Sequence, residues 1–276
     1  SADQHTGTST DDRGVWSGST GANGKKGTRL ITDLRNRGAT MIDALIHDIN
    51  YLNKNRWNLL KENKKPKIGW LSIYTPEEII HAAGMIPYHI TGESKLNFPK
   101  ASTHMHSNLC PYVLSSFEED LDGVHDFAKG TIFVNACDAR RRMYDVYKHF
   151  DQSKFLYLLD FSKVVNINSK RYFRLQLQKL IFALENYFHC KITNEALHEA
   201  IKLWNKTRNL LSELYEYRRT GNADITGSQA MKLVKASMIG LKEEFNIRLS
   251  RLLDQIKKKS SKINTEIRYS FLICGS

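Results

Sequence analysis

The 276-residue sequence contains few prolines and few cysteines, and it has no long apolar run. Its five prolines and sixteen glycines exclude a collagen-like or proline-rich chain. Its four cysteines are too sparse for a disulfide-rich secreted scaffold, which favours a reducing, cytoplasmic setting. No stretch of about 18 apolar residues occurs, so the sequence predicts no membrane span. A hydrophobic share of 41% excludes a wholly disordered protein.

Basic residues outnumber acidic residues, and the formal net charge is +12. Such a charge favours a polyanionic partner, a class that includes nucleic acids and nucleotide-derived cofactors. The densest basic runs lie at residues 64–65, 140–142 and 257–259, and no zinc finger, leucine zipper or RNA-binding strand accompanies them. We therefore expect no nucleic-acid partner. A basic interaction module without catalysis is an alternative interpretation of the same charge.

The first 65 residues divide into two parts of different character. Residues 1–28 are mostly small and polar, with only Val15 and Trp16 as large apolar groups, which predicts a disordered tail. From residue 29 to residue 65 apolar residues recur at helical spacing, and Gly38 is a candidate break. We therefore expect an N-terminal helical segment that ends near Asn63.

Residues 66–165 alternate short apolar runs with helical patterns. The apolar runs at 68–74, 86–90, 131–135 and 155–159 predict strands, and the patterns at 77–84 and 138–149 predict helices. Strands that alternate with helices are typical of a parallel sheet. The sequence therefore predicts an α/β fold with a Rossmann-like, parallel-sheet lobe.

The rest of the chain is predicted to be almost entirely helical. Residues 166–264 show three amphipathic patterns, at 175–184, at 197–214 after Thr193, and at 231–256, with a loop at 219–227. Residues 265–276 contain an apolar run, 267–274, that ends in a glycine turn. We expect this run to be the first strand of a second α/β lobe that is mostly absent from the sequence.

Two cysteines are the strongest candidates for chemistry. Cys110 and Cys137 each end an apolar stretch just before a helical one, and α/β folds place their sites where strands end before helices. The amides of a helix N-terminus favour a thiolate, which is the form that ligates iron or zinc. Two thiolates can hold part of an iron–sulfur cluster. Because no CxxC pair is present, two inert buried cysteines are the alternative.

Three nearby residues offer weaker signals. His104 and His106 would face the same way on a strand and could join the two cysteines in a structural zinc or iron site. His81 is more typical of a partly buried surface histidine than of a metal ligand.

Four blocks of sequence occur in an order that resembles a known family. They are residues 68–87, which include Pro76-Glu77-Glu78, then Cys110-Pro111 with 115–118, then 135–141 around Cys137, and finally 191–208. Together they are similar to the 2-hydroxyacyl-CoA dehydratase and benzoyl-CoA reductase family, over roughly residues 60–276. The resemblance implies two α/β lobes with a helical part.

The resemblance also implies a cofactor and partners. It implies a [4Fe–4S] cluster held by three cysteines, with Cys110 and Cys137 in the first two positions. The third position belongs in the second lobe, so Cys274 and Cys190 are both weak candidates for it. The implied partners are a related second subunit, an ATP-dependent activator iron–sulfur protein that delivers single electrons, and an acyl-CoA substrate. Aromatic ring reduction and 2-hydroxyacyl-CoA dehydration stay open, as do a catalytic and an electron-relay role.

A few polar residues in or near these blocks are further candidates for the site. Glu78 would act on substrate protons or near the cluster, although a first-turn carboxylate that complements the helix dipole is the simpler alternative. Ser107 would hydrogen-bond a cluster sulfur or the thioester carbonyl, and a turn role is the alternative. The arginines at 140–142 would meet CoA phosphates or a partner, or would form a solvated helix face.

Overall fold

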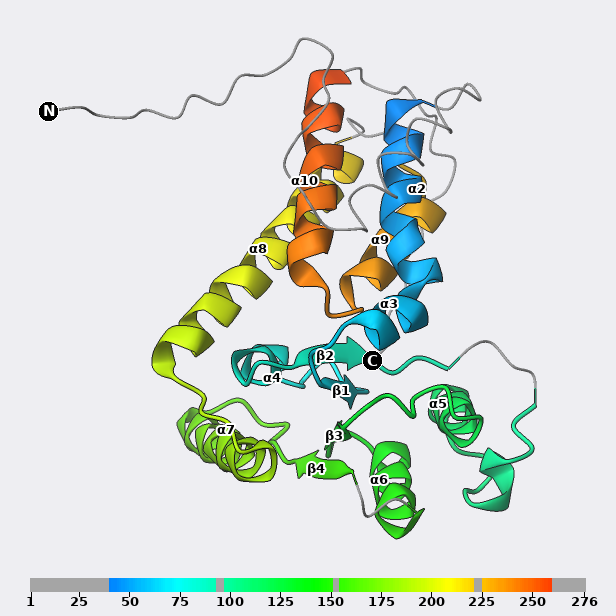
Figure 1. The fold of residues 1–276 in the computed structure, drawn as a ribbon, viewed down its shortest axis with the longest axis vertical. Helices are drawn as coiled ribbons and strands as arrows, with labels where there is room; N and C mark the ends of the chain where they lie inside the picture. The colour runs from blue at the N-terminus through cyan, green and yellow to red at the C-terminus, as the bar shows by residue number, and fades with distance from the viewer. Residues whose placement is uncertain (1–39, 93–96, 151–153, 221–224, 260–276) are drawn as a thin grey trace, which may run out of the picture.

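The computed structural model describes residues 40–92, 97–150, 154–220 and 225–259 (Figure 1). The predicted tail at 1–28, the predicted strand at 267–274 with Cys274, and Gly38 lie outside these ranges. The described elements form an α/β layer with a group of long helices packed at one side of it (Figure 1).

Four parallel strands form the sheet. They are β1 (Lys67–Trp70), β2 (Ile86–His89), β3 (Gly130–Val134) and β4 (Phe155–Leu159), in the order β2-β1-β3-β4. The two central strands are buried along their whole length, as expected for a parallel sheet covered on both faces. The predicted Rossmann-like parallel sheet is confirmed.

The alternation of side chains along β3 shows how helices cover the two faces. Ile132 and Val134 pack with residues of α4 (Glu77–Ala82) and α7 (Ile167–Phe188), whereas Phe133 packs with α5 (Pro111–Leu121) and α6 (Asp138–Phe150). Successive strand residues point to opposite faces, so α4 and α7 cover one face and α5 and α6 the other. The sheet is therefore the middle layer of three.

The remaining helices pack mainly on one another. They are α2 (Met41–Lys54), α3 (Arg56–Glu62), α8 (Asn194–Arg219), α9 (Gly227–Ser237) and α10 (Lys242–Lys259), and α10 contacts α2, α8 and α9. Thr193 caps α8, as predicted, because its side chain accepts from the amide of Ala196 at 3.1 Å. The long α8 connects the two parts, since it contacts α4 as well as α10 (Figure 1). Among the described helices, none combines the length and the apolar character needed to cross a bilayer.

The prediction of one helix over residues 231–256 is wrong. The chain leaves α9 after Ser237 and starts α10 at Lys242, and Gly240 between them has a φ of +82°. The amide of His89 donates to the carbonyl of Met238 at 3.0 Å, so this turn lies on the edge of β2. A Cβ atom at position 240 would lie 1.8 Å from the carbonyl oxygen of Pro87. The break at Gly240 therefore allows the turn to lie against β2. Helical periodicity in the sequence does not indicate such a contact with a distant strand.

The N-terminal helical prediction holds in part. Within the described residues the chain forms α2 and α3, and Asn55 separates them with a non-helical ψ of 15°. Its side-chain amide donates to the carbonyl of Tyr51 at 3.0 Å, which caps α2. The helix and its predicted extension are therefore two helices.

Candidate functional site

All four strands are parallel, so their carboxyl ends meet at one edge of the sheet. The chain runs from β1 outward to β2 and then crosses back to β3, which makes the space between β1 and β3 the point where the strand order reverses. Open α/β sheets bind ligands at the carboxyl ends of the strands beside such a point. The segments that follow β1 and β3 flank it here.

Cys137 lies just after the carboxyl end of β3. Its carbonyl accepts from the amide of Arg141 at 3.3 Å, so Cys137 stands at the start of α6. Two residues before it, the side-chain amide of Asn135 donates to Asp160 at the end of β4, at 2.9 Å. The Cys137 side chain is exposed. This thiol therefore lies at a helix N-terminus on the edge beside the switch point.

Cys110 occupies the equivalent place before α5. It is the N-cap residue, and its carbonyl accepts from the amides of Val113 and Leu114 at 2.9 and 3.1 Å. Pro111 at the first helical position is pre-organised for the start of a helix. Cys110 is exposed, as Cys137 is. Both cysteines are thus exposed, and the alternative in which they are buried is wrong.

A tyrosine fixes the start of α5 to the end of β2. The hydroxyl of Tyr112 donates to the carbonyl of Ile90 at 2.7 Å and lies 2.9 Å from Nε2 of His89. The phenol has one hydrogen, which the carbonyl takes, so the phenol oxygen accepts a hydrogen bond from Nε2–H of His89. Consequently α5 begins at the carboxyl end of β2, on the same edge as the start of α6.

Arg140, in the first turn of α6, carries a charge that acts on His89 and on Tyr112 in the first turn of α5. Burial lowers the pKa of His89 to about 4, and the positive charge of Arg140 adds to this effect. Burial raises the pKa of Tyr112 to about 12, which Arg140 opposes. Arg140 therefore lies near enough to both groups for its charge to act on them. The three consecutive arginines therefore differ in their surroundings. Arg141 and Arg142 are exposed and pair with carboxylates on their own helix, whereas Arg140 is half-buried.

Three buried nitrogen atoms at this edge have no hydrogen-bond partner in the described structure. They are Nε1 of Trp70, Nδ1 of His89 and Nε of Arg140. The rings of Trp70 and His89 lie 4.3 Å apart, with Trp70 at the end of β1. The tryptophan and arginine nitrogens carry hydrogens, and N–H groups are the donors that tune the sulfur atoms of iron–sulfur clusters. Buried donors without partners are rare in folded proteins and mark this edge as a place for an acceptor.

These groups fit part of an iron–sulfur site. Two exposed thiols at helix starts and two unpaired N–H donors match the ligand and donor chemistry of such a cluster. Across the described ranges, no group of three or more His, Cys, Asp or Glu residues is arranged to hold a metal ion. The third cysteine that the resemblance implies is thus not among the described residues at this edge.

Cys190 lies at the other end of the sheet. It follows α7, and the ring of Phe188 packs 5.5 Å from that of Phe155, the first residue of β4. The thiol is half-buried and lies 3.9 Å from the carbonyl oxygen of Leu184. Burial raises the pKa of the Cys190 thiol, which disfavours the thiolate.

The histidines at 104 and 106 do not lie on a strand. His104 follows the short 3₁₀ helix η1 (Ala101–Thr103), and its ring packs 4.5 Å from that of Phe150. Met105 between them is buried, whereas both histidines are exposed. In the described part of the chain, the zinc alternative has no arranged set of ligands.

The predicted catalytic residues occupy different surroundings. Glu78 lies in the first turn of α4, after β1, and its carboxylate accepts from the guanidinium of Arg208 on α8. Ser107 is exposed, three residues before Cys110, and forms no hydrogen bond with another described residue. His81 is half-buried with its ring 4.9 Å from that of Trp204, and burial lowers its pKa.

Glu77 is a charged residue that the sequence pattern did not single out, and it pairs with a buried lysine. Its carboxylate lies 3.4 Å from Nζ of Lys242, which is itself buried. Burial raises the pKa of Glu77, and Lys242 opposes this shift. The two neighbouring glutamates look alike in sequence, and only the packing of α8 and α10 on α4 distinguishes them.

Comparison with known proteins supports the resemblance. The profile of the family described as 2-hydroxyglutaryl-CoA dehydratase, D-component, matches residues 72–276. A benzoyl-CoA reductase subunit from Thauera aromatica is 28% identical over 206 residues, which cover 74% of this chain and 53% of the relative. The β subunit of (R)-2-hydroxyglutaryl-CoA dehydratase from Acidaminococcus fermentans is 28% identical over 216 residues, or 76% of this chain and 57% of the relative.

A third relative is the β subunit of (R)-phenyllactyl-CoA dehydratase from Clostridium sporogenes, which is 26% identical over 199 residues, covering 72% of this chain and 53% of its own. The chain thus spans about half the length of the curated relatives it matches. The matched residues include both exposed cysteines and the strands β2, β3 and β4. The chain belongs to the 2-hydroxyglutaryl-CoA dehydratase D-component family.

Proposed function

We propose that this chain is an iron–sulfur subunit of a low-potential acyl-CoA dehydratase or reductase, with Cys110 and Cys137 as two of its cluster ligands. The observation that supports this proposal is the placement of two exposed cysteines at the starts of α5 and α6, on one edge of the sheet. Family membership supplies the class of reaction. Two helix starts direct partial positive charge to this edge, which favours bound thiolates and their cluster.

The chain's own residues would hold and tune the cofactor. When bound, a [4Fe–4S] cluster would supply single electrons at low potential, and the protein supplies position and electrostatics. Cys110 and Cys137 would ligate iron, and Cys274, beyond the described residues, is a candidate for the third position. The unpaired N–H groups of Trp70 and Arg140 would donate to acceptors at the same edge.

Glu78 and Ser107 complete the proposed site. Arg208 orients the Glu78 carboxylate at the carboxyl end of β1, where it can accept a proton from a substrate carbon or hydroxyl. Ser107 carries an exposed hydroxyl near the Cys110 helix start and can donate to a thioester carbonyl, where negative charge develops on reduction.

The partners are part of the same proposal. The relatives are named as subunits of benzoyl-CoA reductase and of 2-hydroxyacyl-CoA dehydratases, and we propose a related second subunit for this chain. An acyl-CoA substrate and an ATP-dependent activator that delivers single electrons follow from the class of chemistry. A reducing cytoplasm suits the three described cysteines, which are all free thiols.

Anaerobic reconstitution of the full 276-residue chain with iron and sulfide tests the ligand assignment. We expect iron and acid-labile sulfide to bind in similar amounts, and Cys110→Ser or Cys137→Ser to reduce both. Cys190→Ser is the matched control, because this thiol lies at the opposite end of the sheet, and it should retain the content of the unmodified chain.

Two outcomes would contradict the proposal. If Cys110→Ser and Cys137→Ser both retain full iron and sulfide, the ligands are wrong. If the chain binds iron without acid-labile sulfide, it holds a simple metal ion and not a cluster. Circular dichroism of each variant shows whether a loss of iron reflects the missing thiol or a failure to fold.

A further inference from the structure

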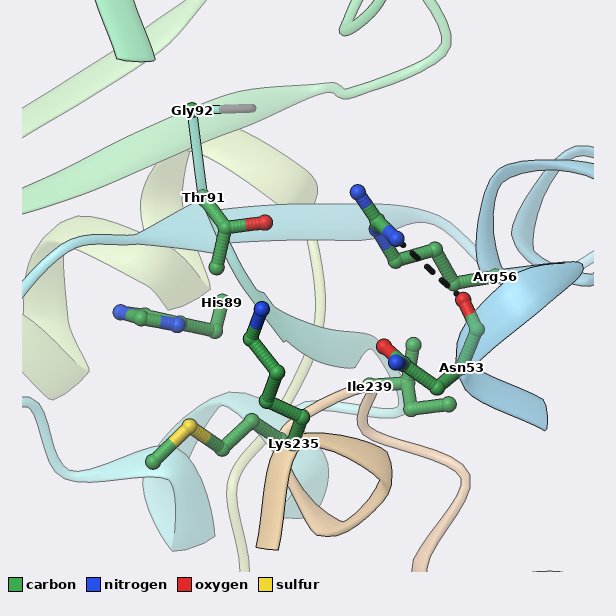
Figure 2. A pocket seen from close by; sticks show the side chains of 8 residues that line it. Asn53, Arg56, His89, Thr91, Gly92, Lys235 and Ile239 are labelled. Atoms are coloured by element: carbon green, nitrogen blue, oxygen red, sulfur yellow. Dashed lines mark hydrogen bonds between the residues drawn. The ribbon is translucent and has the colours of Figure 1, made fainter. Parts of the chain in front are cut away.

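The two outermost strands of the sheet, β2 and β4, differ in how their free sides are covered. The amide of His89 in β2 donates to the carbonyl of Met238 at 3.0 Å. Asn53 of α2 and Lys235 of α9 line, together with His89, a cavity of about 300 Å³ at the end of this strand (Figure 2). Pro87 lies two residues before His89, on the same side of β2, and has no N–H group. The helical group and a proline therefore protect β2 from further strand pairing.

The side of β4 that faces away from β3 is open. The amide of Phe155 donates to the carbonyl of Lys129, and the carbonyl of Leu159 accepts from the residue that follows β3. Main-chain groups point alternately to the two sides of a strand, so the N–H and C=O groups of Leu156 and Leu158 point away from β3. Within the described residues no hydrogen bond satisfies these groups, and β4 is the last strand of the sheet.

The usual protections of an outer strand are missing from β4. The strand contains no proline and no charged residue. The flanking helices do not close over it, because a cavity of about 720 Å³ lies along residues 155–157, between Tyr144 of α6 and Ala183 of α7. The open side of β4 therefore combines unpaired backbone groups with room beside them, which is the condition for adding a further strand.

We propose that β4 pairs with β4 of a second copy of this chain, antiparallel and about a two-fold axis at Tyr157. A closed two-fold dimer uses the same surface on both subunits, and the two equal strands then run in opposite directions. In this register Leu156 of each copy lies opposite Leu158 of the other, and each such pair exchanges both of its main-chain hydrogen bonds. The outward groups of both leucines are then satisfied, and the two sheets become one.

The charges that flank β4 favour a second copy as the added strand. Lys154 immediately precedes the strand and Asp160 immediately follows it. In the antiparallel register the lysine of each copy comes opposite the aspartate of the other, so opposite charges meet at both ends. A shift of the register by two residues would separate these charges. The strand is therefore complementary to itself in charge, in hydrogen bonding and in length.

Sedimentation equilibrium of the full 276-residue chain, free of iron and under reducing conditions, tests the proposal. We expect a monomer–dimer equilibrium with a dissociation constant on the order of 10 μM or tighter. A chain that stays monomeric up to about 100 μM would show that a second copy does not occupy this side of β4. Because no iron is present, the result is independent of the proposed cluster.

A proline variant tests the role of the backbone groups. Leu158→Pro removes one outward N–H from each copy and retains the hydrogen bonds to β3, because that N–H does not point toward β3. It should weaken the dimer by about tenfold or more, since two hydrogen bonds across the axis are lost. Leu158→Ala is the matched control, because it removes the same side chain and keeps the N–H. Equal dissociation constants for the two variants would contradict the proposed pairing. If circular dichroism shows that Leu158→Pro does not fold, a cross-link at Tyr157 decides.

That cross-link tests the register directly. In a pair centred on Tyr157, the two copies of this residue face each other without hydrogen bonds, with Cα atoms about 4.5 Å apart, which a disulfide can span. With the four native cysteines replaced by serine, Tyr157→Cys should form a covalent dimer on mild oxidation. Leu158→Cys is the control, because in this register it lies opposite Leu156 and not opposite itself. If neither variant cross-links, or if both do so equally readily, the proposal is wrong.

Discussion

The hydroxyl of Tyr112 lies 2.9 Å from Nε2 of His89, and their rings are nearly parallel, with planes 19° apart. This pair joins the first turn of α5 to the last residue of β2. The same hydroxyl donates to the carbonyl of Ile90. Since Cys110 immediately precedes α5, this contact fixes the position of the first proposed cluster ligand relative to the sheet.

Removing the hydroxyl with Tyr112→Phe should lower the free energy of unfolding. It should also loosen the start of α5, which carries Cys110. The change leaves Nε2–H of His89 and the carbonyl of Ile90 without their partner, which costs about 1–3 kcal/mol. Urea unfolding measures this cost, and iron retention after reconstitution should fall in parallel. Tyr144→Phe is the control, because the Tyr144 hydroxyl forms no hydrogen bond within the described residues, and its effect should be below about 0.5 kcal/mol. Equal effects of the two changes would contradict the assigned role.

The protonation of His89 gives a prediction with a defined pH window. Burial, with Arg140 and Lys242, lowers its pKa to about 4, whereas an unfolded histidine titrates near 6.5. Between these values the unfolded chain binds more protons, so the free energy of unfolding should fall as the pH decreases from about 6.5 to about 4. His89→Gln should flatten this dependence by up to about 3 kcal/mol over the window.

Two measurements check that prediction. Urea unfolding of the unmodified chain and of His89→Gln across the window gives the two slopes, with His106→Gln, at an exposed position, as the reference for loss of a histidine. The ring C–H signal of His89 followed by NMR should titrate near pH 4 in the folded protein. A midpoint near 6.5 would show that the ring is not held neutral by its surroundings.

Gly240 and Gly84 provide a matched test of the turn that separates α9 from α10. Both have left-handed backbones, with φ of +82° and +80°. A Cβ atom at Gly84 would meet nothing within 4 Å, whereas one at Gly240 would clash with the carbonyl of Pro87. Gly84→Ala should therefore cost only the backbone strain, about 1 kcal/mol, and Gly240→Ala clearly more, because the turn must move off β2. Thermal or urea unfolding compares them, and equal losses would show that the Pro87 contact is not important.

The predictable parts of the fold are those whose signal is local. The β-branched run at 131–135 became β3 within one residue, and 155–159 became β4 without change, because central and edge strands of this kind are short apolar runs. The break at Gly240 was missed because its cause is Pro87, which is distant in sequence. Periodicity records which face of a helix is apolar and does not record where a sheet interrupts it.

The site shows the same division between local and tertiary information. The sequence pattern placed Cys110 and Cys137 just before helices, where the structure has them, but only Cys137 follows a strand, because η1 and a turn precede Cys110. Sequence could not separate Arg140 from Arg141, because consecutive helical residues point about 100° apart and only their neighbours decide which is buried. Likewise, the unpaired Nε1 of Trp70 and the pocket between α2, α9 and β2 arise from segments that have no relation along the chain.

The helical group is held together by a buried ion pair between α2 and α10. Arg248 donates to both the carboxylate and the carbonyl oxygen of Asp48, the latter at 2.9 Å, and both side chains are almost fully buried. A second bond joins Arg248 to Glu244, which is more exposed. Burial raises the pKa of Asp48, and Arg248 opposes that shift. The pair therefore depends on each partner to offset the desolvation of the other.

Removing one partner should lower the free energy of unfolding by far more than the intact ion pair contributes to it. Asp48→Ala leaves the Arg248 guanidinium buried with only Glu244 beside it, and we expect a loss of about 3–5 kcal/mol in the free energy of unfolding. The double variant Asp48→Ala/Arg248→Met should recover much of that loss, because no buried charge remains unpaired. Glu216→Ala, which breaks an exposed pair with Arg219 on α8, is the control and should leave stability nearly unchanged. If the double variant is as unstable as the sum of its single changes, the two residues act independently, and this pair does not connect α2 to α10.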